Sequence, residues 1–499
     1  MPATVGRLPV SSVPTLWDEV TSEVAAGRRF ADLFATARPD GLLLSAQLAG
    51  PGGISTLEAM LPASATAYPA LTPRLGAAFW YEREIHDLFG VVPEGHPRLD
   101  PLILPQTSGR PPRPGAAEGP GRGEEAIDPD PRAVPSHVVG PGLFTIPHGP
   151  VRSGVVESVE YLVETPGEEI PHLNMRIFYK HRGIEKRFDG QPAADGLLLA
   201  ERAEGIASVA HALAYCHALE QIAGSEVPWA AALIRVLHAE LERIACHLDV
   251  VVRLADGAGL AVATARFGWH KERVLRLTGD LCGSRFGRGV VVPGGVSARP
   301  LLAPADLLAR AGVLDHEIAA DLRLLLGTAS FLDRLRRTGP LRPERAAQHG
   351  ALGPVGRASG VTEDARQARP YDAYGSLGAA AATRGGGDAL ARLEVRVDEI
   401  AHSFRLLRQA ASELEETGAA PLRAPCEPAA GRAAGWAEAP QGEVLYDVRV
   451  EDGRVSRCRS RSASFHNLVL MHEVFAGDIL TDFPFIEASF GLSVAGAAG

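Results

Sequence analysis

A run of proline, glycine, arginine and glutamate between residues 106 and 142 divides this chain of 499 residues. It contains the stretch RPPRPGAAEGPGRGEE, and DPDPR follows shortly after. A segment of this composition cannot bury enough apolar surface to offset the entropy lost on ordering, so it is predicted to be a linker. The chain is then expected to fold as two domains, residues 1–105 and 143–499, each with its own core.

The bulk composition excludes several classes of protein. Hydrophobic residues make up 46% of the chain, which is enough for a sizeable core, and the formal net charge of −10 argues against nucleic acid as a partner. No window has the roughly 20 consecutive apolar residues of a membrane helix. The first residues lack the basic start and apolar run of a secretory signal. We therefore expect a cytoplasmic protein that reaches a membrane only through partners.

The five cysteines are too far apart to form a closely spaced metal clamp. None lies within four residues of another, whereas zinc and iron–sulfur sites commonly use Cys-x-x-Cys pairs. Each is expected to be a buried free thiol, since cysteine packs as a small hydrophobic residue. They are Cys216, Cys246, Cys282, Cys426 and Cys458.

The first domain is predicted to be a small α+β domain. Short apolar runs at 42–44 and 54–57 lie on either side of a Pro/Gly break at 50–53. The segment 79–90, FWYEREIHDLFG, has apolar residues near helical spacing. It ends at Gly90, a plausible helix C-cap.

The second domain is predicted to be mainly α, a helical bundle with β-hairpins. Alternating apolar residues at 159–163 and 173–179 indicate two strands of a hairpin. Apolar stripes predict one helix over 229–254 and another that begins after Asp388 as its N-cap.

Two further elements are expected in this domain. A long helical region is predicted over 302–335. A late hairpin is predicted to turn at Asp452-Gly453.

Four segments concentrate charge or unusual residues: YKHRGIEK, ELERIACH, RASGVTEDAR and DFP. They begin at residues 179, 240, 357 and 482 respectively. Taken alone, each is more often a solvated face or an ion pair at a helix end than a functional site.

Together and in this order, these segments resemble one family. EREIHDLFG at 82–90, continuing to Gly95-His96-Pro97, resembles the signature of the small (30-kDa-type) peripheral-arm subunit of complex I. Residues 146–496 resemble the quinone-site (49-kDa-type) subunit of complex I and the large subunit of membrane-bound nickel–iron hydrogenases. The fused order is similar to that of the large subunit of formate hydrogenlyase-type complexes.

The resemblance places the four nickel-ligand positions at Glu204, Ala207, Ser493 and Gly496. In the hydrogenases these positions are cysteines, because soft thiolates hold the metals in their reactive states. The arginine that overhangs the centre is replaced here by Gln441. The resemblance therefore implies no hydrogenase chemistry and no metal or other cofactor bound by this chain. It also implies that no C-terminal extension is removed during nickel insertion.

The quinone-binding positions of the complex I subunit are altered as well. The resemblance places its histidine at Val156 and its tyrosine at Gly205. Neither side chain can hydrogen-bond a quinone, so standard quinone reduction is doubtful.

A supporting polar shell is retained. Glu185 matches the acid that passes protons from the hydrogenase metal site, and Arg182, Arg357, Asp364 and Arg366 match the polar frame of that cavity. A buried paired carboxylate can titrate near neutral pH and relay protons. The alternative for Glu185 is a structural salt bridge to an arginine of the frame, and the sequence leaves both open.

The four vacated ligand positions are expected to converge on one cavity. Within it, a buried Glu204 must be paired or protonated, since an isolated buried carboxylate costs several kcal/mol. Arg357 or Arg366 is the expected partner.

Three functions remain for comparison. The first is a scaffold and coupling subunit that docks an iron–sulfur subunit (similar to the 20-kDa subunit of complex I), a ferredoxin-like subunit and antiporter-like membrane subunits, at the cytoplasmic face of the membrane. The second is a quinone-reactive subunit of an NADH dehydrogenase-like complex. The third is an assembly or regulatory protein without a redox role.

Overall fold

A computed structural model describes residues 12–105, 142–152 and 157–499. The predicted linker falls almost wholly outside these residues. Contacts divide the chain into two compact units, with the boundary after Arg182 rather than within 106–142. Residues 348–350 and 498 group with the first unit.

The N-terminal part of the first unit combines a helix with an antiparallel sheet, as predicted. Helix α1, Val13–Ala25, begins at Ser12, whose hydroxyl accepts a hydrogen bond from the N–H of Thr15 (3.4 Å). A meander of three strands follows, and α1 packs against it. The strands are β1 Arg29–Arg38, β2 Gly41–Gly50 and β3 Gly53–Pro62.

Helix α2, Phe79–Phe89, ends at Gly90 in the left-handed conformation (φ 68°), so the predicted C-cap is confirmed. Two short parallel strands lie before and after it, β4 Ala67–Pro69 and β5 Val92–Glu94. Three charged residues of α2, Glu82, Arg83 and Asp87, are buried and bonded mainly to nearby backbone. Glu82, for example, accepts hydrogen bonds from the N–H groups of Leu71 (2.8 Å) and Thr72 (2.9 Å).

The hairpin strands after the linker also belong to the first unit. Strands β6 Phe144–His148, β7 Glu160–Thr165 and β8 His172–Arg176 form an antiparallel sheet, which confirms the predicted hairpin. Asn174 of β8 accepts a hydrogen bond from Arg98 (2.8 Å). The expected continuation of the second strand to Tyr179 is wrong, because the chain turns into a 3-10 helix, η3 Phe178–Lys180, and exposes that side chain (43%).

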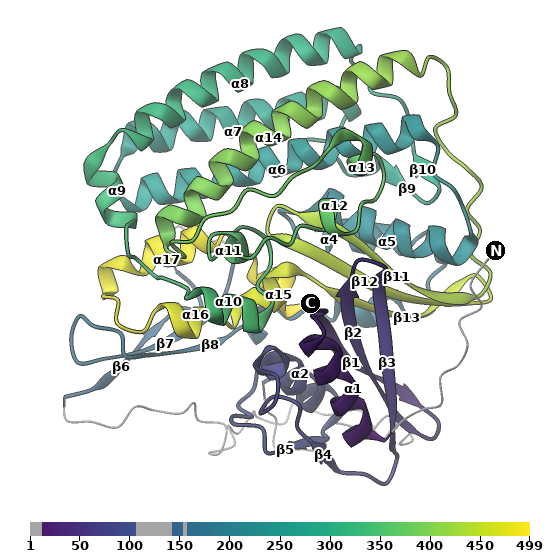
Figure 1. Ribbon diagram of the computed structural model, residues 1–499, viewed down its shortest axis with the longest axis vertical. Helices are drawn as coiled ribbons and strands as arrows, with labels where there is room; N and C mark the ends of the chain where they lie inside the picture. The colour runs from purple at the N-terminus through teal and green to yellow at the C-terminus, as the bar shows by residue number, and fades with distance from the viewer. Residues whose placement is uncertain (1–11, 106–141, 153–156) are drawn as a thin grey trace. The chain divides into compact units, whose positions relative to one another are not determined.

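Four long helices form the bundle of the second unit and lie side by side (Figure 1). They are α6 Trp229–Gly257, α7 Ala261–Cys282, α8 Pro304–Leu326 and α14 Ala389–Glu416. Asp388 caps α14 by accepting the N–H of Ala391 (2.8 Å), as predicted. The helical region expected over 302–335 is broken at Gly327-Thr328, where extended Thr328 begins a second helix, α9 Ala329–Leu335.

A second meander lies below the bundle in Figure 1 and packs against helix α5, Ser208–Ala223. Its strands are β11 Gly431–Ala439, β12 Gly442–Glu451 and β13 Arg454–Arg461. Asp452 and Gly453 have φ values of 50° and 71°, so the predicted hairpin turn is confirmed. A Cβ at Gly435 would lie 2.1 Å from the carbonyl oxygen of Ala214, so this close approach of β11 to α5 requires glycine.

The other helices and strands of the described residues are short. They are η1 Gly76–Ala78, α3 Ile184–Phe188, α4 Leu197–Ala203, β9 Val291–Val292, β10 Gly295–Val296, α10 Pro343–His349, α11 Gly353–Arg357, α12 Ala365–Ala368, α13 Tyr374–Leu377, α15 Ala463–Leu468, α16 Met471–Val474, η4 Leu480–Asp482, α17 Phe483–Phe490 and α18 Val494–Ala498. Among the described helices, none has the length and apolarity needed to cross a membrane.

Candidate functional site

The turn between α4 and α5 carries the first two vacated ligand positions. Glu204 follows the last residue of α4 in an extended conformation, and Ala207 precedes α5. The N–H of Ala207 donates to the carbonyl of Glu204 (3.3 Å), which closes the turn. Both side chains are buried.

The C-terminal segment brings the other two positions to the same place. Ser493 caps α18 by accepting the N–H of Gly496 (3.1 Å). The hydroxyl of Ser464 on α15 donates to Glu204 Oε1 (3.0 Å) and accepts the N–H of Ser493 (3.0 Å). A Cβ at Gly496 would lie 2.5 Å from Glu204 Oε2. The structure therefore brings together the two parts of the chain that the resemblance requires to meet.

Glu204 is paired with a histidine. Its Oε2 lies 3.2 Å from Nε2 of His211, and Nδ1 of His211 lies 2.9 Å from the hydroxyl of Tyr446. Glu204 and His211 are 1% and 2% exposed, so each forms a hydrogen bond with the other in place of one with water. The result is a continuous hydrogen-bonded chain from Ser464 through Glu204 and His211 to Tyr446.

The expectation that Arg357 or Arg366 pairs with Glu204 is wrong. Arg357 contacts Glu399 and Glu438, and Arg366 contacts Asp364 and Glu240. A carboxylate takes the nearest buried donors, and these are fixed by packing between elements remote in sequence.

The residues at the vacated positions do not fit a nickel–iron centre. They supply one carboxylate and one hydroxyl, with no thiolate, and the carboxylate is held by His211 and Ser464. The Glu204 side chain also lies against Gly496, where a cysteine would have to stand.

The position of the lost arginine lies beside the same turn. Nε2 of Gln441, in the β11–β12 connection, donates to Sγ of Cys246 (3.3 Å). That thiol in turn donates to the carbonyl of Ile206 (3.1 Å). Like the other four cysteines it is free; Cys216 and Cys458 are buried as predicted, whereas Cys246, Cys282 and Cys426 are only partly buried.

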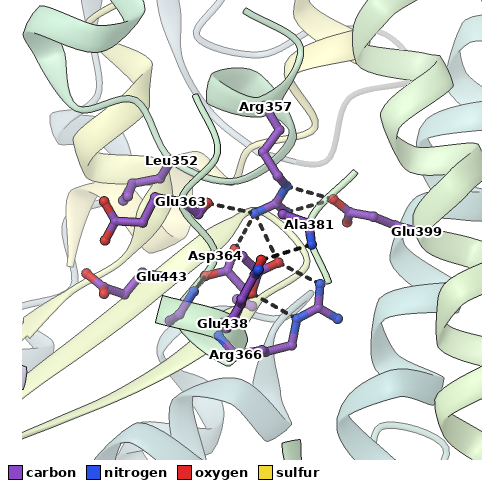
Figure 2. Close-up of polar contacts among 12 residues, drawn as sticks. Leu352, Arg357, Glu363, Asp364, Arg366, Ala381, Glu399, Glu438 and Glu443 are labelled. Atoms are coloured by element: carbon purple, nitrogen blue, oxygen red, sulfur yellow. Dashed lines mark hydrogen bonds and ion pairs between the residues drawn. The ribbon is translucent and has the colours of Figure 1, made fainter. Parts of the chain in front are cut away.

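Three of the predicted frame residues meet in a buried charge network (Figure 2). Arg357, fully buried, binds Glu399 (2.7 Å), Glu438 (2.9 Å) and Asp364 (3.3 Å). Arg366 binds Asp364 (2.7 Å) and extends the network to Glu240 of α6 (3.1 Å). We call this set, together with Arg243 and His247, the charge network.

Local structure explains how two of these side chains reach the network. A Cβ at Gly353, the first residue of α11, would lie 2.1 Å from the carbonyl oxygen of Gln441, so α11 packs directly on the β11–β12 connection. Arg357, the last residue of α11, therefore reaches Glu438. Asp364 caps α12 by accepting the N–H of Arg366 (3.0 Å).

Two of the charged segments singled out in the sequence, those that begin at residues 240 and 357, are joined here by the ion pair of Arg366 with Glu240. His247 binds Glu399 (2.8 Å), and Arg243 binds Glu240 (3.3 Å). Sequence reasoning missed Glu399 and Glu438 as members. The available signal was weak: each is a carboxylate on an element that is otherwise mostly apolar on its buried side.

One carboxylate of the charge network titrates near neutrality. Burial, reinforced by the negative charge of Asp364 and only partly offset by Arg357, raises the pKa of Glu438 to about 7. Burial would also raise the pKa of Glu240, but Arg243 and Arg366 outweigh it and lower that pKa to about 2. Of these two carboxylates, Glu438 is the one that can exchange a proton at physiological pH.

Glu185 lies outside this network and is bound by other arginines. Arg457 (2.8 Å) and Arg459 (3.2 Å) of β13 and the N–H of Ser460 (3.0 Å) hold its carboxylate. Glu185 therefore does form a salt bridge, but the prediction that its partner is an arginine of the frame is wrong. Burial raises the pKa of Glu185, but the two arginines more than offset this and leave the pKa lowered.

The remaining predicted positions lie outside the charge network. Arg182 is the last residue of the first compact unit, whereas the other frame residues belong to the second. Val156 lies outside the described residues. Gly205 is exposed, and a Cβ there would meet no atom within 4 Å.

Comparison with known protein families supports the resemblance that the sequence indicates. The chain matches the family described as "Respiratory-chain NADH dehydrogenase, 49 Kd subunit" over residues 260–425 and 420–497. It matches the family described as "Respiratory-chain NADH dehydrogenase, 30 Kd subunit" over residues 45–117.

Individual relatives extend the match over most of the chain. A subunit of the NADH-quinone oxidoreductase of Desulfitobacterium hafniense is 30% identical over 357 residues, which cover 69% of this chain and 94% of the relative. Formate hydrogenlyase subunit 5 of Escherichia coli is 28% identical over 443 residues, which cover 87% and 77%.

A solved structure supports the fold. A chain of the membrane-bound sulfane sulfur reductase, an archaeal respiratory membrane complex, aligns with a TM-score of 0.66 at 23% identity. The alignment covers 73% of this chain and 100% of that one. The α+β and mainly helical architecture predicted from the sequence is confirmed. This chain belongs to the family of the complex I 49-kDa subunit and the related membrane-bound hydrogenase large subunits, with a 30-kDa-type region in its N-terminal part.

Proposed function

We propose that this chain is the large subunit of a membrane-associated, complex I-like complex in which it transmits redox energy without holding a metal. The observation that carries the proposal is the pairing of Glu204 with His211 and Ser464 at the vacated ligand positions. The residues there form a closed polar cluster rather than an open coordination site. The relatives support membership of such a complex, because they are subunits of NADH-quinone oxidoreductase and formate hydrogenlyase.

Two features suit the chain to proton-linked coupling. In the hydrogen-bonded chain from Ser464 to Tyr446, the two hydroxyls and the ring of His211 can each donate or accept, whereas Glu204 donates only when it is protonated. Glu438 gains or loses a proton near pH 7 inside a network of fixed charges. A change of charge in a neighbouring redox subunit would shift that pKa and move a proton.

The proposed partners follow from the same assignment. They are an iron–sulfur subunit similar to the 20-kDa subunit of complex I, a ferredoxin-like subunit, and antiporter-like subunits in the membrane. With these, the chain would lie at the cytoplasmic face of the membrane as a peripheral subunit.

Purification of the native complex through a tag on this chain tests the proposal. We expect membrane subunits and an iron–sulfur subunit to copurify, with iron present but no stoichiometric nickel. About one nickel per chain would refute the closed cluster, and a chain isolated without membrane subunits would favour an assembly or regulatory role.

A quinone-reactive role is the second candidate, favoured by the 30% identity to a subunit of NADH-quinone oxidoreductase. Quinone-dependent turnover by the purified complex, abolished by variants around Gly205, would establish it. Turnover with soluble carriers alone would exclude it.

A further inference from the structure

A histidine of α5 lies between two hydrogen-bond acceptors. Nδ1 of His217 lies 2.8 Å from the carbonyl oxygen of Trp436 in β11, and its Nε2 lies 3.1 Å from the carboxylate of Asp372, in the segment between α12 and α13. The ring also packs against that of Tyr371, with 5.1 Å between the two ring centroids. The other oxygen of Asp372 accepts a hydrogen bond from Arg235 of α6 (3.1 Å).

The two acceptors determine the charge of the ring. A carbonyl oxygen can only accept a hydrogen bond. Burial would raise the pKa of the Asp372 carboxyl, but Arg235 and His217 outweigh it and leave that pKa lowered, so the group is a carboxylate. A neutral imidazole carries one N–H and can satisfy only one of the two oxygens, whereas the imidazolium donates to both. The geometry therefore fits His217 in its protonated form.

The charged groups around His217 come from three elements. Asp372 faces it from the segment between α12 and α13, Glu220 from α5 itself, and Arg235 from α6. Burial lowers the pKa of His217, but Asp372 and Glu220 outweigh burial and Arg235 and leave the pKa raised from its ordinary value of 6.5. The side chain is 12% exposed, so it is not sealed from solvent.

The segment held by this histidine also contacts the charge network. Tyr371 precedes Asp372, and its hydroxyl accepts the N–H of Glu438 (2.8 Å). Tyr374 follows, and its hydroxyl donates to Glu240 (2.6 Å). Between them Asp372 has a φ of 47°, a left-handed conformation that a residue other than glycine keeps only where other contacts hold it. The contacts of the Asp372 side chain therefore help to position both tyrosines.

We propose that His217 is a pH-sensitive latch on the segment 371–374. The protonated ring fastens this segment to α5 and β11 and keeps both tyrosines on the charge network. When the proton is lost, one of the two hydrogen bonds is lost with it, and the segment opens more often. The latch lies outside the proposed function, since it requires neither a redox partner nor a proton relay.

The first test measures the protonation of the ring. Exchange of the C2 hydrogen of a histidine ring, followed by mass spectrometry over a series of pH values, reports the pKa of each histidine in the full-length chain. We expect a pKa above 6.5 for His217. A measured value at or below 6.5 would overturn the latch.

The second test measures opening of the segment. The N–H of Tyr374 donates to the carbonyl of Tyr371 (3.1 Å), so its hydrogen exchange reports opening. Stability that comes from a raised pKa is present below pH 6.5 and is lost as the pH rises through the folded pKa. Protection of this amide, corrected for the intrinsic rate, should fall about tenfold between about pH 6 and about pH 9, because one charge-assisted hydrogen bond is lost. Protection that stays constant over this range would contradict the latch.

Two variants assign the effect to this ring. His217→Gln does not titrate, so protection of the segment 371–374 should no longer depend on pH and should match the low value of the unaltered chain at high pH. His316→Leu, at an exposed histidine of α8, should keep the full pH dependence. A dependence that survives in His217→Gln would assign the titration to another group and refute the latch. The measured pKa of His217 needs only the unaltered chain, so it decides the question even where the variant fails to fold.

Discussion

Glu82, Arg83 and Asp87 of α2 and the charge network of the second unit are all buried, but they are satisfied in different ways. In α2, Glu82 takes its hydrogen bonds from Leu71 and Thr72, 11 and 10 residues away and largely from backbone. In the network, Arg357 binds the carboxylates of Glu399 and Glu438, 42 and 81 residues away, and also donates to the backbone carbonyl of Glu363.

The two clusters therefore differ in what they can transmit. A carboxylate bound by the N–H groups of one nearby loop holds that loop in place. A network of side chains joins α6, α11, α12, α14 and β11, and the pKa of each member depends on the charges of the others. Only the second arrangement can pass a change of charge between distant elements.

Removal of the central cation should have the largest effect. Arg357→Met leaves Glu399, Glu438 and Asp364 without their shared arginine, and we expect a loss of about 4 kcal/mol in the free energy of unfolding. Urea denaturation measures it. Arg357→Lys, which keeps the charge but loses the fork geometry, should lose less; equal losses would show that packing, not charge, holds the network.

Glu82→Gln should have a smaller and more local effect. The amide keeps one oxygen acceptor but loses the second and the charge, so we expect about 2 kcal/mol of destabilisation. Hydrogen exchange should accelerate at the amides of Leu71 and Thr72 while amides of the second unit keep their protection. Faster exchange in both units would contradict the local character of this cluster.

The pH dependence of stability should reveal Glu438. Its folded pKa of about 7 lies above the ordinary value of 4.5, so the folded chain binds this proton more tightly than the unfolded chain. The stability it contributes is present below pH 4.5 and is lost as the pH rises to 7, about 3 kcal/mol in all. Denaturation from about pH 5 to about pH 8 should show this decline, and Glu438→Gln should remove it. An unchanged profile in the variant would assign the decline to another group.

The smallest effect is expected at an exposed pair. Lys186 binds Asp189 at 2.9 Å, but the lysine side chain is 86% exposed. Lys186→Ala should change the free energy of unfolding by less than about 0.5 kcal/mol. A loss as large as that of Glu82→Gln would mean that surface pairs near Glu185 contribute to the fold.

The identity of the charged segments could be predicted, but not their partners. The segments containing Arg357, Asp364 and Arg366 were visible as charge on a Gly-broken loop, and the structure joins them. Glu438 and Glu399 were not visible, because a single carboxylate in a strand or helix gives no periodic signal. Glu185 was matched to the frame, yet β13 supplies its arginines.

Sequence patterns alone were enough to predict the long helices at 229 and 389, the hairpin turn at Asp452-Gly453 and the loss of all four thiolates. These are properties of composition, periodicity and residue identity within short windows. The tertiary structure was needed to show that Glu204 pairs with His211 and Ser464, and that Glu185 takes its arginines from β13. The physical reason is that a buried polar group binds whatever packing places within about 3 Å, and packing is set by elements far apart in the chain.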